Sequence, residues 1–229
     1  MEQLSFQDLG VMSYKQAWEY QEKLFDAYQS AKTQGHTTDK GVLLFVEHPH
    51  VFTIGKSGNL SNLLVNEQYL RDKGADFYHI NRGGDITYHG PGQIVGYPIF
   101  NLDAFQIGVR EYIHKLEEAV IECLRCWNIQ AERLEGATGV WLDAHSETNA
   151  RKICAIGVRA SRGITMHGFA FNVNTDLSFY QWINPCGFTN RGVTSMARET
   201  GENLALDTVK TELLRCLGSQ FGVQFSAGT

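Results

Sequence analysis

Three long amphipathic segments determine the fold class, because groups of short apolar segments separate them. Residues 13–33 show helical spacing behind a Ser13–Gln16 capping box, and residues 108–127 and 207–221 repeat that spacing. Strands are predicted at 42–47, 51–55, 77–82, 94–100, 130–134, 139–143, 152–160, 165–173 and 223–226, with shorter helical pieces at 66–73 and 177–183. This order predicts an α+β fold with a mixed β-sheet flanked by helices, since regular β-α alternation is missing.

The chain length fits one domain. We expect residues 1–229 to form it, with a core of helices and strands over about 10–200 and a C-terminal helix and short strand over about 205–226. No basic stretch followed by an apolar run opens the chain, and no window approaches the ~20 apolar residues of a membrane span. The chain has five cysteines, an odd number, and they do not show the short spacings of a disulfide framework. We therefore expect their thiols to be reduced. These features predict a soluble cytoplasmic protein without a membrane partner.

The net charge is −5, from 20 basic and 25 acidic residues, which disfavours nucleic-acid binding. The total conceals an asymmetry. Residues 151–198 contain six basic residues and one acidic residue, giving +5, while the rest of the chain carries 14 − 24 = −10. Such a segment predicts an acidic macromolecular partner, although arginines scattered over the surface would give the same count.

The segment RGGDITYHGPGQ, residues 82–93, has four glycines between polar and aromatic side chains. Glycines allow backbone N–H groups to approach a ligand closely. The segment matches neither the dinucleotide pattern GxGxxG nor the phosphate-loop pattern GxxxxGK[ST]. A ligand-binding loop and a hairpin with an unusual turn both remain open.

Lys152 stands in an otherwise apolar strand, where it would be either a functional buried amine or the exposed start of the strand. Two cysteines are candidate nucleophiles. Cys154 would face the same side of the strand as Lys152, and Cys186 lies in a Pro-Cys-Gly turn that exposes side chains. The remaining cysteines, Cys123 and Cys126 in one helix and Cys216 in another, are interpreted as packing residues.

The histidines do not predict a metal site. His48 and His50 flank Pro49, but no carboxylate or cysteine stands at a ligand spacing beside them. His89 and His167 lie in glycine-rich strands, where they suit either hydrogen bonding in a site or burial in the core.

Four blocks together resemble the bacterial octanoyltransferases, also called lipoyl(octanoyl) transferases. In chain order they are EHPHVFTIGKSGNL, RGGDITYHGPGQIVGYPIFNL, RKICAIGVRASRGITMHGFAFNVN and NPCGFTNRGVTSM. They occur over about residues 42–198, in the same order as in the family. The resemblance implies the fold of biotin protein ligases and lipoate ligases. It also implies transfer of an octanoyl group from octanoyl-acyl carrier protein to a lysine of a lipoyl domain, through an acyl-thioester on cysteine and without a cofactor. The acceptors would be the E2 subunits of 2-oxoacid dehydrogenases and the glycine-cleavage H protein.

The same resemblance assigns site residues. Cys186 matches the nucleophile and Lys152 its partner, which favours Cys186 over Cys154. The substrate-binding positions implied are Arg82, Gly83, Gly84, Asp85, Ile86, Thr87, Tyr88, His89, Ala155, Ile156, Gly157, Gly168, Phe169 and Ala170. We further expect Tyr88, Ile156, Phe169 and Phe171 to line an acyl channel. Two rival functions are an ATP-dependent lipoate or biotin ligase, which needs no cysteine, and a non-catalytic module that binds carrier domains.

Overall fold

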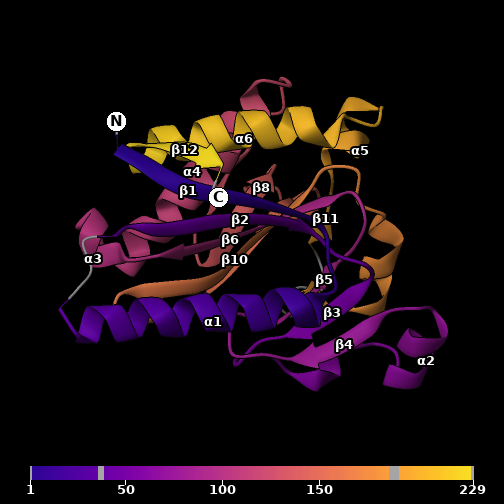
Figure 1. Cartoon of the computed structure of the whole chain (residues 1–229). Coiled ribbons are helices and arrows are strands. Elements are labelled where there is room, and N and C mark those ends of the chain that lie inside the picture. The colour runs from indigo at the N-terminus through magenta and orange to yellow at the C-terminus, as the bar shows by residue number, and fades with distance from the viewer. Residues whose placement is uncertain (1, 36–38, 186–190, 228–229) are drawn as a thin grey trace.

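A mixed β-sheet forms the centre of the molecule (Figure 1). The structure is a computed structural model that describes residues 2–35, 39–185 and 191–227. Within these ranges the strand order is β12-β1-β2-β6-β10-β9-β8-β7, and β11 pairs with β9. Parallel pairs join β1 to β12, β1 to β2 and β9 to β11, while the other neighbours are antiparallel. The bounds are β1 Glu2–Val11, β2 Gly41–Glu47, β6 Gln93–Phe100, β7 Glu132–Leu134, β8 Ala137–Leu142, β9 Arg151–Ser161, β10 Ile164–Asn172, β11 Gly192–Val193 and β12 Val223–Ala227.

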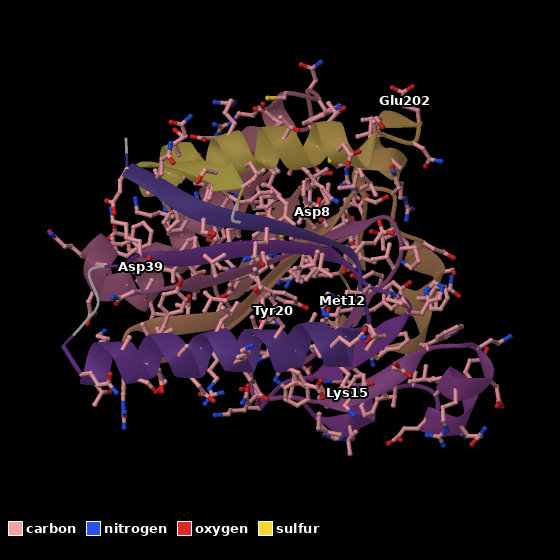
Figure 2. The ribbon with its side chains drawn as sticks, viewed as in Figure 1. Asp8, Met12, Lys15, Tyr20, Asp39 and Glu202 are labelled. Carbon is pink, nitrogen blue, oxygen red and sulfur yellow. The ribbon has the colours of Figure 1, made fainter. Side chains whose placement is uncertain are left out.

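Helices cover both faces of this sheet, as the α+β prediction requires. Helix α1 (Tyr14–Thr33) packs against β6 and β10, while α4 (Val109–Arg125) and α6 (Leu206–Phe221) pack together on the other face (Figure 1). Ser13 caps α1 by accepting the N–H of Gln16, and its hydroxyl donates to Gln16 Oε1. The capping box predicted from the sequence is therefore present. Side chains fill the space between α1 and the sheet, where Tyr20 donates to Gln7 Oε1 of β1 at 2.9 Å (Figure 2).

A second, three-stranded sheet lies beside the first and was not predicted. It has the order β4-β3-β5, from Asp76–His79, Val51–Ile54 and Ile86–His89. Strand β4 ends three residues before the expected limit at residue 82. Strand β5 lies in the segment 82–93, for which the sequence left a ligand-binding loop and a hairpin both open. Short helical elements complete the fold: η1 Leu60–Asn62, α2 Glu67–Asp72, α3 Leu102–Phe105, η2 Leu177–Trp182 and α5 Met196–Thr200.

Strand β1 was also missed by the sequence analysis. It lies between β2 and β12, so the first and last described strands of the chain run side by side (Figure 1). The C-terminal strand thereby extends the large sheet. No helix within the described ranges combines the length and the apolarity needed to cross a bilayer.

Candidate active site

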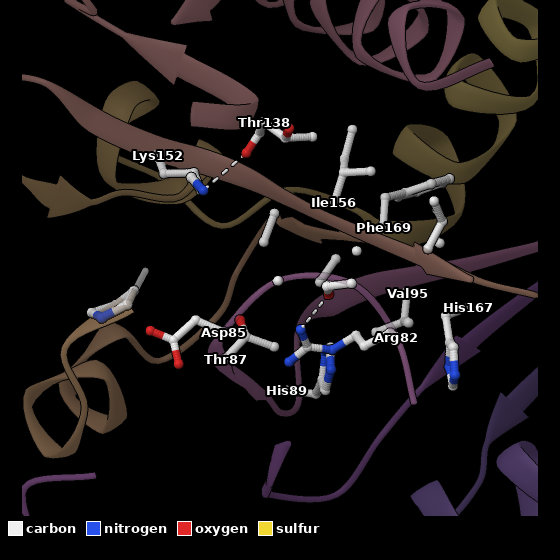
Figure 3. Close-up of a pocket in the computed structure, with 18 of the residues that line it drawn as sticks. Arg82, Asp85, Thr87, His89, Val95, Thr138, Lys152, Ile156, His167 and Phe169 are labelled. Carbon is white, nitrogen blue, oxygen red and sulfur yellow. Dashed lines mark hydrogen bonds between the residues drawn. The ribbon is translucent and has the colours of Figure 1, made fainter. Parts of the chain in front are cut away.

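A cavity of about 500 Å³ opens between the β9–β10 pair and the segment 82–89. That volume suits a small-molecule or acyl ligand. Its walls follow β9 from Lys152 to Val158 and β10 from Asn172 back to His167, because these strands pair antiparallel. Figure 3 shows Lys152 and His167 at opposite ends, with Ile156 and Phe169 between them. The cavity is therefore elongated along the strands.

Lys152 is buried at one end of this cavity, with 7% of its surface exposed. Its Nζ donates to the carbonyl oxygen of Thr138 at 3.0 Å (Figure 3) and lies 4.7 Å from the centre of the Trp141 ring. The reading of Lys152 as the exposed start of a strand is therefore wrong. A buried amine that lines a cavity is a group available for proton transfer.

The backbone beside Lys152 is held by helix α4. Glu117, a buried residue of that helix, accepts the N–H of Gly139 at 2.9 Å and the Nε–H of Arg133 at 3.1 Å. Gly139 has φ +121°, and a Cβ there would lie 2.5 Å from the carbonyl oxygen of Cys154. A glycine is required at this close approach, and Glu117 fixes the peptide that follows Thr138.

The glycine-rich segment packs directly on β9. The N–H of Gly83 donates to the Val158 carbonyl at 2.9 Å, and a Cβ on Gly157 would lie 2.8 Å from the Gly83 carbonyl oxygen. Arg82 is buried, and its guanidinium donates to the Thr53 carbonyl at 2.8 Å and to the Gly83 carbonyl at 3.0 Å. These contacts turn the segment into a wall of the cavity. Side chains and backbone between Arg82 and Thr87 therefore face the same space as Lys152.

Neutral histidines and tyrosines form the other end. Tyr14, His89, Tyr97 and His167 all line the cavity there. Burial lowers the pKa of both His89 and His167 to about 3, with Arg82 adding to the effect in each case. His89 donates from Nδ1 to Gln93 Oε1 at 2.9 Å, since the Gln93 amide nitrogen donates to the carbonyl of Tyr88.

His48 and His50 have structural partners. His48 Nδ1 lies 2.7 Å from the Met12 carbonyl, and its Nε2 lies 2.8 Å from the Tyr97 hydroxyl. His50 Nδ1 lies 2.7 Å from the hydroxyl of Tyr88.

The described cysteines do not supply an activated thiol at this site. Cys154 is fully buried, and burial raises the pKa of its thiol. Cys123 and Cys216 are buried, as expected, but Cys126 is exposed, so its interpretation as a packing residue is wrong. Cys186 lies outside the described residues. Its neighbour in the sequence, Pro185, lines the cavity.

Most predicted binding residues meet at this cavity. Arg82, Gly83, Gly84, Asp85, Ile86, Thr87, His89, Ala155, Ile156, Gly157, Gly168, Phe169 and Ala170 line it together with Lys152. Tyr88 and Phe171 do not line the cavity, although the sequence analysis expected both to line the acyl channel. Tyr88 packs beside Phe179 and Phe52 in the core of the small sheet, and Phe171 belongs to the main core.

Sequence reasoning missed several lining residues, including Tyr14, Val95, Tyr97 and Thr138. Their positions in ordinary helix and strand patterns gave no signal. The burial of Gln21, which does not line the cavity, was missed as well. The sequence did carry a signal for it, because Gln21 is a polar residue on the apolar face of α1.

This fold is that of the catalytic domain of lipoyl protein ligases. The sequence profile of the lipoyl protein ligase A/B catalytic domain matches residues 13–218. A bi-partite lipoate protein ligase from Thermoplasma acidophilum has a TM-score of 0.74 at 17% identity, over 100% of this chain and 88% of that chain. Biotin protein ligase from Aquifex aeolicus, in complex with biotin and ATP, has a TM-score of 0.53 at 14% identity, over 97% of this chain and 71% of that one. At these identities the likeness shows a shared fold.

Sequence relatives show to which enzyme family within this fold the chain belongs. The octanoyltransferase of Parabacteroides distasonis is 55% identical over 213 residues, covering 93% of this chain and 96% of the relative. That of Flavobacterium johnsoniae is 51% identical over 224 residues, covering 95% and 96%. The chain therefore belongs to the bacterial octanoyltransferases, and octanoyl transfer in lipoate biosynthesis is its activity. The resemblance drawn from the sequence blocks is confirmed.

Proposed function

We propose that the chain carries an octanoyl group from octanoyl-acyl carrier protein to a lysine of a lipoyl domain, through an acyl-thioester on Cys186. The acceptors would be the lipoyl domains of E2 subunits and the glycine-cleavage H protein, in the cytoplasm. The observation that carries the proposal is the arrangement of the cavity. A buried amine, Lys152, stands at one end of a largely apolar space, and Pro185 brings the chain to its wall one residue before Cys186.

Two half-reactions use the same groups. The Cys186 thiolate attacks the carrier's thioester carbonyl, the bond from carbon to the pantetheine sulfur breaks, and Lys152 gives a proton to the departing thiolate. The acceptor amine then attacks the enzyme thioester, the bond from carbon to the Cys186 sulfur breaks, and Lys152 takes the proton released by the amine. This is ping-pong acyl transfer. Exchange of thioesters is nearly balanced and amide formation is downhill, so neither step needs ATP.

The cavity supplies the remaining requirements. Apolar side chains such as Ile156 and Phe169 would bury the alkyl chain. About seven methylene-sized groups at ~0.8 kcal/mol each give roughly 5–6 kcal/mol before the costs of binding. Backbone N–H groups of the glycine segments would stabilise the carbonyl oxygen as charge develops on it, at ~3 kcal/mol for each donor.

Mass spectrometry tests the proposal directly. The protein is incubated with octanoyl-carrier protein without ATP, and its intact mass and peptide map are recorded. We expect one octanoyl adduct on Cys186, retained in Cys154→Ala and lost in Cys186→Ala. Absence of any adduct, or an adduct on Cys154 that survives Cys186→Ala, would contradict the assignment. Lipoylation by Cys186→Ser that depends on ATP would favour the ligase rival.

A further inference from the structure

Three exposed apolar side chains occur in one short stretch of the chain. Leu60 is 54% exposed, Leu64 is 52% exposed and Tyr69 is 38% exposed. The other large apolar side chains with such exposure among the described residues, Val11 and Val109, stand singly in the sequence. A single exposed apolar residue is ordinary on a protein surface, whereas a group of them is typical of an interaction site. This stretch is therefore a candidate contact surface.

Backbone hydrogen bonds join the stretch to the chain that enters the wall of the cavity. The N–H of Leu64 donates to the Trp182 carbonyl at 2.9 Å, and the N–H of Asn184 donates to the Asn62 carbonyl at 2.8 Å. Pro185, the next residue of the chain, lines the cavity. The exposed leucines are thus held next to the chain where it reaches the cavity.

A second connection between the stretch and the cavity runs through Asp85. Its carboxylate accepts the backbone N–H of Asn59 at 3.1 Å and a hydrogen bond from the side-chain amide of Asn62. Asp85 lines the cavity, and Figure 3 shows it toward the same end as Lys152. Residues 59–64 therefore lie at the edge of the cavity at this end, and we call them the rim segment.

A cation stands beside the rim segment. Lys56 is exposed, and together with Leu60 and His79 it lines a shallow hollow. No acidic residue occurs between positions 55 and 66, and the nearby Asp85 is half-buried and already accepts two hydrogen bonds from the rim segment. An apolar surface with a cation at its edge suits a protein that presents apolar side chains beside a carboxylate.

We propose that the rim segment, together with Lys56, is the docking surface for the lipoyl domain that accepts the acyl group. The inference rests on the proposed acyl transfer through Cys186. The acceptor lysine carries its amine on a four-carbon stem, so the body of its domain must come against the surface beside the thioester. The carrier delivers its thioester on the longer pantetheine arm, so its body stays farther from the rim segment.

Separate measurement of the two half-reactions tests this assignment. Leu60→Ser/Leu64→Ser is acylated with octanoyl-carrier protein, and the isolated octanoyl-enzyme is mixed with a lipoyl domain below saturation. Transfer to the lipoyl domain should slow roughly tenfold, while acylation of Cys186 by the carrier stays near wild type. Hydroxylamine, a small nucleophile that needs no docking surface, should release the octanoyl group at the wild-type rate. Val11→Ser is the matched control, since Val11 is 71% exposed and lies outside the cavity lining.

Lys56→Glu tests the charge in the same assay. Transfer to the lipoyl domain should slow roughly threefold to tenfold at low salt, and the difference from wild type should shrink as salt is raised. Lys23→Glu makes the same change of charge at an exposed position of α1 and should behave like the wild-type protein. Equal slowing in both lysine variants overturns the role of Lys56.

A wild-type rate of transfer in the double leucine variant, or an equal loss in Val11→Ser, overturns the inference. Slower acylation by the carrier with unchanged transfer overturns it as well, because the surface then receives the carrier. Equal slowing with hydroxylamine also overturns it, since the substitutions then damage the site itself. If the wild-type protein forms no octanoyl adduct on Cys186, the proposed function fails and the inference falls with it.

Discussion

At the scale of single residues, Lys152 shows how a polar group is retained inside the protein. Its Nζ is 3.0 Å from the Thr138 carbonyl and lies over the Trp141 ring. Cation–π contact and a hydrogen bond offset part of the cost of burial. These contacts fix the amine at the end of the cavity, so a variant at this position tests its role in the proposed chemistry.

Lys152→Met should slow the alkylation of Cys186 by iodoacetamide near neutral pH by roughly tenfold, because the thiol would lose a nearby group that favours its thiolate. Rates are read for each cysteine by peptide mapping across a pH series. The exposed Cys126 provides an internal reference whose rate should stay constant. If Cys186 reacts equally fast with and without Lys152 at every pH, Lys152 does not tune the thiol, although it could still deliver protons.

The positions of some site residues could be predicted from the sequence, and the positions of others could not. Glycines and polar residues of the segment 82–89 identified one wall of the cavity, because such residues are unusual in a hairpin. Tyr88, within the same segment, faces the small sheet instead, where its hydroxyl meets His50. That outcome depends on the alternation of side chains in β5, a strand for which the sequence analysis gave no bounds. Thr138 contributes a backbone carbonyl, and no sequence pattern marks such a contribution.

At the scale of elements, the contact between the glycine-rich segment and β9 shapes the cavity. Gly157→Ala would place a Cβ 2.8 Å from the Gly83 carbonyl oxygen and 3.1 Å from Arg82 Cδ. Overpacking of this kind costs typically ~1–3 kcal/mol, and the segment must shift to relieve it. We expect at least a tenfold loss of Cys186 acylation together with a lower melting temperature.

Gly192→Ala is the control for this substitution, since its Cβ would meet Arg151 Cβ at an ordinary 3.5 Å. Activity and melting temperature should remain close to wild type in this variant. Equal acylation rates in Gly157→Ala and wild type would show that the segment accommodates a side chain at this contact.

Glu117 couples helix α4 to β8 and is the subject of a third prediction. Glu117→Leu would leave the Arg133 guanidinium and the Gly139 N–H without this partner in a mostly buried site. Arg133 keeps its ion pair with Glu118 at 2.7 Å, so the main cost is the buried Gly139 N–H left without its acceptor, typically about 1–3 kcal/mol. Urea unfolding measures the loss. Glu117→Gln, which keeps an acceptor for Gly139, should lose less; equal losses would argue against the hydrogen bond.

The long elements were predicted well because their periodicity is strong. Helices α1, α4 and α6 match the expected segments to within two residues at each end. Strand β1 was missed because its partners β2 and β12 lie far along the chain, and its side chains are mostly exposed or half-buried. Strand β5 was given no bounds because its four residues are surrounded by glycines. Pairing between distant segments creates both strands, and local propensity does not encode it.

At the scale of the whole molecule, buried histidines make stability depend on pH. Burial lowers the pKa of His48 to about 4 and those of His89 and His167 to about 3, below the value of 6.5 for an unfolded chain. Their contribution is complete above about pH 6.5 and is lost as the pH falls toward the folded values, since only the unfolded chain binds the protons. The lowered pKa of Glu199 acts in the same direction, but only below its unfolded value of 4.5.

From about pH 7 to about pH 5.5 the free energy of unfolding should therefore fall by about 1 kcal/mol for each of these three histidines. Urea denaturation at the two pH values measures the difference. His48→Phe should reduce the pH-dependent loss by about one third, since it removes one of three such groups. A free energy of unfolding that stays constant over this interval would show that the histidines can protonate inside the folded protein.

Fewer of the basic side chains in residues 151–198 are available to bind a partner than the sequence count suggested. Within residues 151–198, Arg151 pairs with Asp143 and Glu199, and Lys152 is buried. Arg162 and Arg198 are exposed, but they lie far apart. Arg198 follows β11, which pairs with the start of β9 beside Lys152, whereas Arg162 sits at the β9–β10 turn, about 30 Å along the strand. Arg191, which is half-buried with its guanidinium 5.7 Å from the centre of the Trp141 ring, also lies at the Lys152 end. On the proposed function, Arg198 is the exposed arginine of residues 151–198 that a carrier domain would meet at this end.

Arg198→Glu should consequently raise the KM for octanoyl-carrier protein roughly threefold to tenfold at low salt, with little change in kcat, because a charge at the rim of an interface acts on encounter with the partner. The difference from wild type should shrink as salt is raised and the charges are screened. Arg162→Glu makes the same change in net charge at the opposite end of β9, and its KM should stay near wild type. If both variants raise KM equally, the carrier responds to the total charge of the molecule, and the basic segment has no special role in docking.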